Sequence, residues 1–166
     1  MAEATVLAEL SDQLAAAVER AARSTVLVSA RRRIPASGIV WDATTVLTAD
    51  HVIEQEEAIS ILLPDGSSHD ATVVGRDPGS DLAILRVGAG TLEPAERAPD
   101  DSYHVGSLAL AVGRPSEEGP MASFGIVSAI SGPWRTRRGH RIANYLRSDT
   151  TFFPGFSGGP LVDAAG

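Results

Sequence analysis

The chain has 166 residues, of which 16 are glycine, 10 are proline and none is cysteine, and its formal net charge is −7. The missing cysteines exclude disulfides and thiol nucleophiles, and the acidic balance gives no support to nucleic-acid binding, which needs Lys and Arg to neutralise phosphates. The length suffices for one sizeable core or two small ones. Glycine, proline and short Val, Ile and Leu runs favour an all-β fold.

The compartment is predicted from the first residues and from the apolar runs. The start shows no basic segment followed by a continuous apolar one, and no run approaches the length of a membrane span. We therefore expect a cytoplasmic protein without a membrane span. A periplasmic or extracellular location is the alternative if a leader was removed.

Residues 1–23 are predicted to form an N-terminal amphipathic helix. Leu7, Leu10, Leu14, Val18 and Ala21 recur at helical spacing, with most charged residues off that stripe. We expect the stripe to pack on the first of two β-barrels, with an oligomer contact as the alternative.

Residues 24–100 are predicted to form that first barrel. Its six short apolar runs cover residues 24–30, 37–41, 45–49, 58–63, 71–77 and 82–87. The first two runs are joined through Arg31, Arg32 and Arg33, where we expect a solvated hairpin, with a basic contact as the alternative. The proline- and acid-rich stretch from Gly88 to Asp101 predicts a linker.

Residues 101–166 offer four further strand candidates, which are too few for a complete second barrel. They cover residues 107–113, 122–130, 141–149 and 159–163. We therefore expect the second barrel to be incomplete.

The segment Gly155-Phe156-Ser157-Gly158-Gly159-Pro160 is the strongest chemical signal. Its glycines permit a tight turn, and backbone N–H groups beside the Ser157 hydroxyl could stabilise the oxyanion of an acyl-transfer intermediate. The G-x-S-x-G elbow also fits this segment, but there the acid and the histidine follow the serine. Only nine residues follow Ser157 and none is a histidine, so the order His, Asp, Ser is favoured.

Two upstream residues suit that order. His51 ends an apolar run, and Asp81 lies between a turn and the apolar run that starts at Leu82. The alternative, in which these residues and Ser157 have only structural roles, needs three coincidences in one order. The other histidines, His69, His104 and His140, show no metal-ligand spacing, so neither a metal nor another cofactor is predicted.

Three segments resemble the HtrA (Deg) family of trypsin-like serine proteases. They are SGIVWDATTVLTADHV around His51, SDLAILRV around Asp81 and PGFSGGPLV around Ser157, and VGSLALAVGRP and ASFGIVSAISG resemble the family's second barrel. The resemblance implies a chymotrypsin-like double β-barrel in which Ser157 is the nucleophile, His51 the base and then acid, and Asp81 its orienting group. The N–H groups of Gly155 and Ser157 would form the oxyanion hole.

The same resemblance implies substrates and partners. Thr151 stands where trypsin keeps an acid in its pocket, and Phe152 and Phe153 follow, so we expect cleavage after small or medium apolar residues rather than after Lys or Arg. The implied activity is hydrolysis of unfolded or damaged polypeptides. Related enzymes assemble as trimers through N-terminal segments, which implies a homo-oligomer.

The family pattern continues past Gly166 into the final strands of the second barrel and, in many relatives, into a PDZ domain. We therefore expect a truncated chain that needs a complementing C-terminal segment. The alternative function is an incomplete or inactive protease fold that acts as a binding or scaffold module by pairing with another chain.

Overall fold

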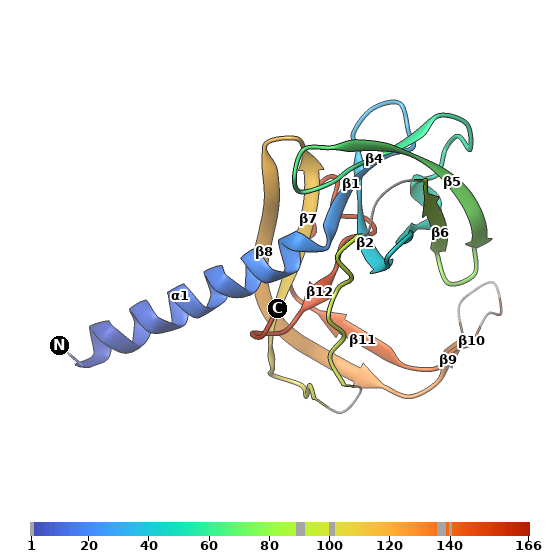
Figure 1. The fold of residues 1–166 in the computed structure, drawn as a ribbon. Coiled ribbons are helices and arrows are strands. Elements are labelled where there is room, and N and C mark those ends of the chain that lie inside the picture. The colour runs from blue at the N-terminus through green and yellow to red at the C-terminus, as the bar shows by residue number, and fades with distance from the viewer. Residues whose placement is uncertain (1, 89–91, 100–101, 136–138, 140) are drawn as a thin grey trace.

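In a computed structural model, residues 2–88, 92–99, 102–135, 139 and 141–166 are described. They form helix α1 (Ala2–Arg23), a closed barrel and an open sheet, and Figure 1 shows α1 extending away from the two β-structures. Part of the predicted linker, residues 89–91 and 100–101, lies outside the described residues, as does His140.

The closed barrel occupies the first half of the chain. Its strands are β1 (Thr25–Ser29), β2 (Ala36–Asp42), β3 (Thr45–Ala49), β4 (Ile59–Leu62), β5 (Ser68–Asp77) and β6 (Leu82–Val87). They follow one another around the barrel in the order β1-β2-β3-β6-β5-β4, and every neighbouring pair is antiparallel. Each strand overlaps one of the six apolar runs that the sequence predicted.

The alternation of side chains explains how the barrel closes. In β6, Ala83, Leu85 and Val87 are buried while Leu82 and Ile84 are largely exposed, because successive residues of a strand point to opposite faces. β-Branched residues dominate the filled interior, among them Val26, Val28, Val46, Ile59 and Ile61. The barrel therefore has a core of its own.

The second half of the chain forms the open sheet. Its strands are β7 (Leu108–Ser116), β8 (Gly119–Ser131), β11 (Tyr145–Ser148) and β12 (Leu161–Val162), in the order β11-β8-β7-β12. A short pair, β9 (Trp134–Arg135) with β10 (Arg141–Ile142), lies beside it. The predicted all-β fold with an incomplete second barrel is thus confirmed.

Helix α1 packs on the open sheet, which corrects the prediction that it would pack on the first barrel. Ala17 and Ala21 lie in one buried cluster with Leu110 and Val112 of β7. Small alanine side chains let the helix approach the strand closely. Further toward the N-terminus, the stripe is uncovered, and Leu7 is 69% exposed.

Within the described residues, no helix is long and apolar enough to cross a membrane.

Candidate active site

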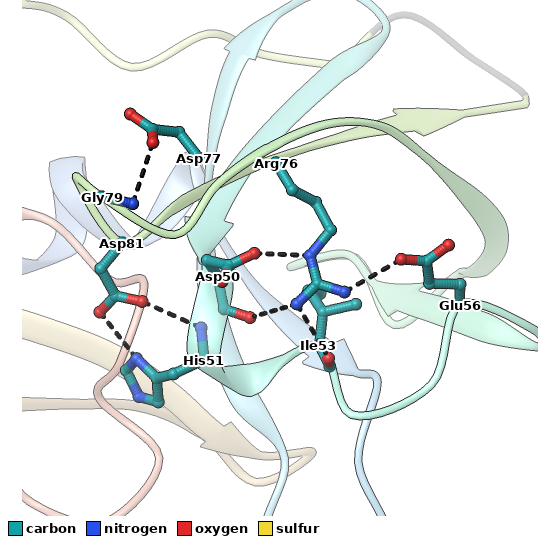
Figure 2. Close-up of polar contacts among 8 residues, drawn as sticks. All are labelled: Asp50, His51, Ile53, Glu56, Arg76, Asp77, Gly79 and Asp81. Atoms are coloured by element: carbon teal, nitrogen blue, oxygen red, sulfur yellow. Dashed lines mark hydrogen bonds and ion pairs between the residues drawn. The ribbon is translucent and has the colours of Figure 1, made fainter. Parts of the chain in front are cut away.

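His51 and Asp81 are brought together by two neighbouring strands. His51 lies in a 3₁₀ turn, η1 (Asp50–Val52), directly after β3, and Asp81 directly precedes β6, which pairs with β3. One carboxylate oxygen of Asp81 accepts the backbone N–H of His51 at 2.9 Å, and the other lies 2.7 Å from Nδ1. Figure 2 shows the imidazole directed at this carboxylate.

The backbone at Asp81 is what aims the carboxylate. Asp81 has φ of +59°, a left-handed conformation that Asp tolerates better than most residues. Its carbonyl oxygen accepts the N–H of Asp50 at 3.1 Å, so main chain and side chain both hold the histidine turn. The preceding turn is closed by the Asp77 carboxylate, which accepts the N–H of Gly79 at 2.9 Å (Figure 2).

Ser157 completes the group from the other half of the chain. Its Oγ lies 3.1 Å from Nε2 of His51, a separation of 106 residues in sequence. When Nδ1 carries the proton donated to Asp81, Nε2 is the acceptor that faces the serine hydroxyl. The structure therefore places Asp81, His51 and Ser157 in one line of hydrogen bonds, an arrangement that activates a serine for acyl transfer.

The backbone before Ser157 forms a turn of defined type. The N–H of Phe156 donates to the carbonyl of Phe153 at 3.0 Å, and the third turn residue, Gly155, has φ of +91°. Pro154, the second residue, is locked at negative φ, which excludes a type I′ turn and leaves type II. A type I turn would rotate the Pro154–Gly155 peptide and turn the Gly155 N–H away from its present direction.

Ser37 of β2 links the loop that carries Ser157 to the first barrel. Its backbone N–H donates to the carbonyl of Ser157 at 3.0 Å, and its hydroxyl donates to the carbonyl of Gly155 at 2.7 Å. The same hydroxyl accepts the N–H of Arg114 at 2.8 Å, and the Ser37 carbonyl accepts the Thr48 hydroxyl at 2.7 Å. Because Ser37 is fully buried, water does not compete for these bonds.

A second anchor is aromatic. Phe156 is 4% exposed, packs edge-on against Phe153 and lies against Gly113, where a Cβ atom would come within 2.8 Å of its ring. Burial of this ring gives the loop a second fixed point, close to the Ser37 hydroxyl, because both lie beside Gly113. The glycine at position 113 makes room for it.

Arg76 of β5 holds the histidine turn from behind, as Figure 2 shows. Its guanidinium donates to the Asp50 carboxylate at 2.5 Å and to the Asp50 and Ile53 carbonyls at 3.2 and 3.3 Å. A further bond reaches the Glu56 carboxylate at 3.0 Å. The hydrogen bond to Asp50, followed by that to Glu56, raises the pKa of Arg76 above its ordinary value. The turn that carries His51 is thus clamped on both sides.

A cleft of about 930 Å³ opens at Ser157. Phe152 and Phe153, two of the three predicted pocket residues, line it together with Arg31, Arg32 and Arg33. Thr151 does not line it, and the Thr151 carbonyl accepts the Ser123 hydroxyl at 2.6 Å. In the part of the chain that the structure describes, no group of three or more His, Asp or Glu residues could hold a metal ion.

Sequence reasoning missed the residues that position the site. A serine at the start of a strand, such as Ser37, carries no signal of its own. The Asp50–Arg76 pair had a weak sequence signal, because Asp50 directly precedes the candidate histidine and a buried carboxylate needs a partner. The arginines between β1 and β2 lie in a hairpin with Arg32 and Arg33 exposed, as predicted, and the fold also makes them a wall of the cleft.

The comparison with protein families agrees with this geometry. The trypsin-like peptidase domain matches residues 36–166. The chain belongs to this family. The match starts with β2, so it includes all three residues of the hydrogen-bonded line.

Individual proteins to which the chain is similar are bacterial proteases. The chain is 38% identical over 133 residues to the periplasmic pH-dependent serine endoprotease DegQ of Escherichia coli K12. It is 35% identical over 136 residues to the periplasmic serine endoprotease DegP of Salmonella typhimurium. The serine endoprotease DegS of Haemophilus influenzae is 34% identical over 123 residues. These matches cover 73–78% of the chain, and the predicted HtrA (Deg) membership is confirmed.

The relatives are much longer proteins. The chain spans only 28–35% of the length of these three.

The turn before Ser157 generates a first prediction, the substitution Gly155→Ala. A Cβ atom there would collide with Pro115 and approach the Pro35 carbonyl to 3.2 Å, in addition to the strain of a left-handed alanine. Gly66→Ala is the matched control, because Gly66 has φ of +84° but no atom within 4 Å of the new Cβ. We expect the control to lose about 1 kcal/mol in urea unfolding and Gly155→Ala to lose clearly more. Equal losses would show that the close packing of the turn is not real.

The clamp on the histidine turn generates a second prediction, the substitution Arg76→Met. Asp50, whose side chain is 10% exposed, would lose its cation, so we expect the free energy of unfolding to fall by about 1–2 kcal/mol. Arg86→Met on the neighbouring strand β6 is the control, expected to change stability by less than about 0.5 kcal/mol. Urea unfolding of both variants checks this, and indistinguishable midpoints would contradict the clamp.

Proposed function

We propose that the chain carries the catalytic centre of a serine endopeptidase that hydrolyses peptide bonds through an acyl-enzyme on Ser157. The observation that carries the proposal is the line of hydrogen bonds from Asp81 through His51 to Ser157, at 2.7 and 3.1 Å. Family membership supports it, since such a line is the working part of a Ser-His-Asp protease.

In the first half of the reaction, the Ser157 Oγ attacks the carbonyl carbon of the scissile bond while Nε2 of His51 takes its proton. The resulting imidazolium is stabilised by Asp81, which lies 2.7 Å from Nδ1. His51 then gives the proton to the leaving nitrogen, and the C–N bond breaks. Water repeats the sequence on the ester, which frees the acid product and restores the Ser157 hydroxyl.

The oxyanion needs donors that already point at it before reaction. In this proposal they are the N–H groups of Gly155 and Ser157. The type II turn with Gly155 at φ +91° supports the first, because it defines the direction of that N–H. The two bonds from Ser37 to the loop keep the donors in register with His51.

We propose unfolded or damaged polypeptides as substrates. The cleft is open to solvent, and Ser157 is only partly buried. Such a site accepts an extended chain, which folded proteins rarely offer. The exposed rings of Phe152 and Phe153 favour apolar side chains beside the scissile bond.

A second candidate function, a binding module that pairs with another chain, is favoured by the open sheet. Strands β11 and β12 end its strand order, and β8 exposes Met121, Phe124, Ile126 and Ile130 by 37–54%. An added strand could cover such a surface, which is the role proposed for a complementing segment. Stable association with a partner without any hydrolysis would favour this candidate over the first.

We also propose that several copies associate through α1 and that the protein is periplasmic. Leu7 and Leu10, at the exposed end of the α1 stripe, support association of several copies through the helix, as the predicted trimer requires. DegQ and DegP are named periplasmic, which supports a periplasmic location over the predicted cytoplasmic one.

The proposed function predicts how hydrolysis of an unfolded protein responds to substitution. Ser157→Ala should abolish turnover, and Asp81→Asn should reduce kcat by about 10⁴-fold, because the histidine would lose its orienting carboxylate. Circular dichroism and urea unfolding would verify that both variants fold, and Ser102→Ala, an exposed serine away from the cleft, is the control.

Two outcomes would contradict the assignment. Turnover of Ser157→Ala near the parent rate would remove Ser157 as the nucleophile. A loss of less than tenfold in Asp81→Asn would remove Asp81 as the orienting group.

A further inference from the structure

The cleft beside Ser157 has a cationic wall that the catalytic chemistry does not use. We propose that Arg32 and Arg33 form a subsite for a carboxylate on the leaving-group side of the scissile bond. This inference rests on the proposed endopeptidase function and deepens it, since it names a class of substrate: polypeptides with an acidic group shortly after the cleaved bond.

The three arginines of the wall divide into one support and two open cations. The Arg31 guanidinium donates to the carbonyls of Ile34 and Pro35, the latter at 3.2 Å, and so closes the loop between β1 and β2 on itself. Arg32 and Arg33 are exposed, and within the described residues neither has a hydrogen bond or an ion pair. Their guanidinium groups are free to bind a ligand.

The surroundings of the loop indicate which half of a substrate it would meet. The N–H groups of Glu54 and Gln55, in the segment that follows His51, donate to the carbonyl of Ala30 at 3.1 and 3.3 Å. The base of the arginine loop is therefore tied to the His51 side of the cleft. His51 protonates the leaving nitrogen in the proposed mechanism, so the departing half of the substrate extends from this side.

The charge of the wall defines the ligand. Among the residues that line the cleft, three arginines face one acidic residue, Glu54, although the whole chain has a net charge of −7. The charge of the cleft lining is therefore opposite in sign to the net charge of the chain. A guanidinium binds a carboxylate through two parallel N–H···O bonds, which selects this group over neutral amides.

The carboxylate has two sources in a polypeptide, an Asp or Glu side chain or the C-terminal carboxylate of the chain. Both present the same planar acceptor. The arms of the experiment separate them.

The test measures kcat/KM for peptides that share one acyl half and carry Glu, Gln or Lys at the second residue after the scissile bond. Each peptide is made with a free carboxylate and with an amide at its C-terminus. We expect kcat/KM to be about fivefold higher for the Glu peptide than for the Gln peptide and lowest for the Lys peptide. The difference between the Glu and Gln peptides should shrink as salt is added. A gap that follows the C-terminal group instead assigns the subsite to chain ends.

The variant that tests the assignment is Arg32→Gln/Arg33→Gln, in which the ratio of kcat/KM for the Glu peptide to kcat/KM for the Gln peptide should fall to about one. Arg86→Gln/Arg147→Gln is the matched control, because it removes the same charge from exposed positions outside the cleft. The control should keep the preference. A preference retained in the first variant, or lost equally in both, would overturn the proposal.

A binding measurement keeps the proposal testable without turnover. Fluorescence anisotropy of the same peptides with Ser157→Ala should give Kd values about fivefold lower for the carboxylate peptides than for their neutral partners. If the parent chain fails to hydrolyse any peptide but this gap is present, the proposed function fails and the subsite stands. Equal Kd values and equal kcat/KM values for all peptides would overturn the subsite alone.

Discussion

The buried hydrogen bonds of Ser37 are the constraint on which the candidate site depends. The first barrel has a closed strand order and a filled core of its own, whereas Ser157 lies in a loop of the open sheet. Ser37 donates hydrogen bonds to two carbonyls of that loop, those of Gly155 and Ser157. Its hydroxyl also accepts the N–H of Arg114 in β7. The closed barrel thereby sets the position of the proposed nucleophile, Ser157, which its own strands do not carry.

The rest of the site follows from the way the barrel presents His51. Pairing of β3 with β6 places a histidine and an aspartate 30 residues apart within hydrogen-bond distance. Arg76 then holds the turn from one side and Asp81 from the other. Each of these contacts restricts the imidazole, and a restricted imidazole is what general base catalysis requires. The chemistry is concentrated where the two β-structures meet.

Much of this could be predicted from the sequence, and the reasons are physical. Runs of Val, Ile and Leu broken by turn residues predicted the six barrel strands. The glycines around Ser157 predicted a tight turn, because glycine adopts the positive φ that such turns need. The packing of α1 was mispredicted because an amphipathic stripe says that a helix is covered but does not say by what. Ala17 and Ala21 fit β7 because of its surface shape, which a single sequence does not display.

The residues around the site were hidden for a different reason. Ser37, Asp50 and Arg76 act through partners far away in the chain, so no local pattern marks them. The arginine loop was visible as a charge run, but its position beside Ser157 depends on the Ala30 carbonyl meeting the segment after His51. A charge run becomes a candidate binding wall only when the fold places it in the same cleft as Ser157.

The central claim is that Ser157, His51 and the backbone donors of the Gly155 turn form a reactive centre in this chain. Labelling of the purified chain with a fluorophosphonate, followed by intact mass, tests it most directly, because attack on phosphorus needs both the activated hydroxyl and the oxyanion donors. The account predicts one phosphonyl group per chain, with loss of fluoride, and none in Ser157→Ala. A folded parent chain that stays unlabelled, or equal labelling of the variant, would contradict it.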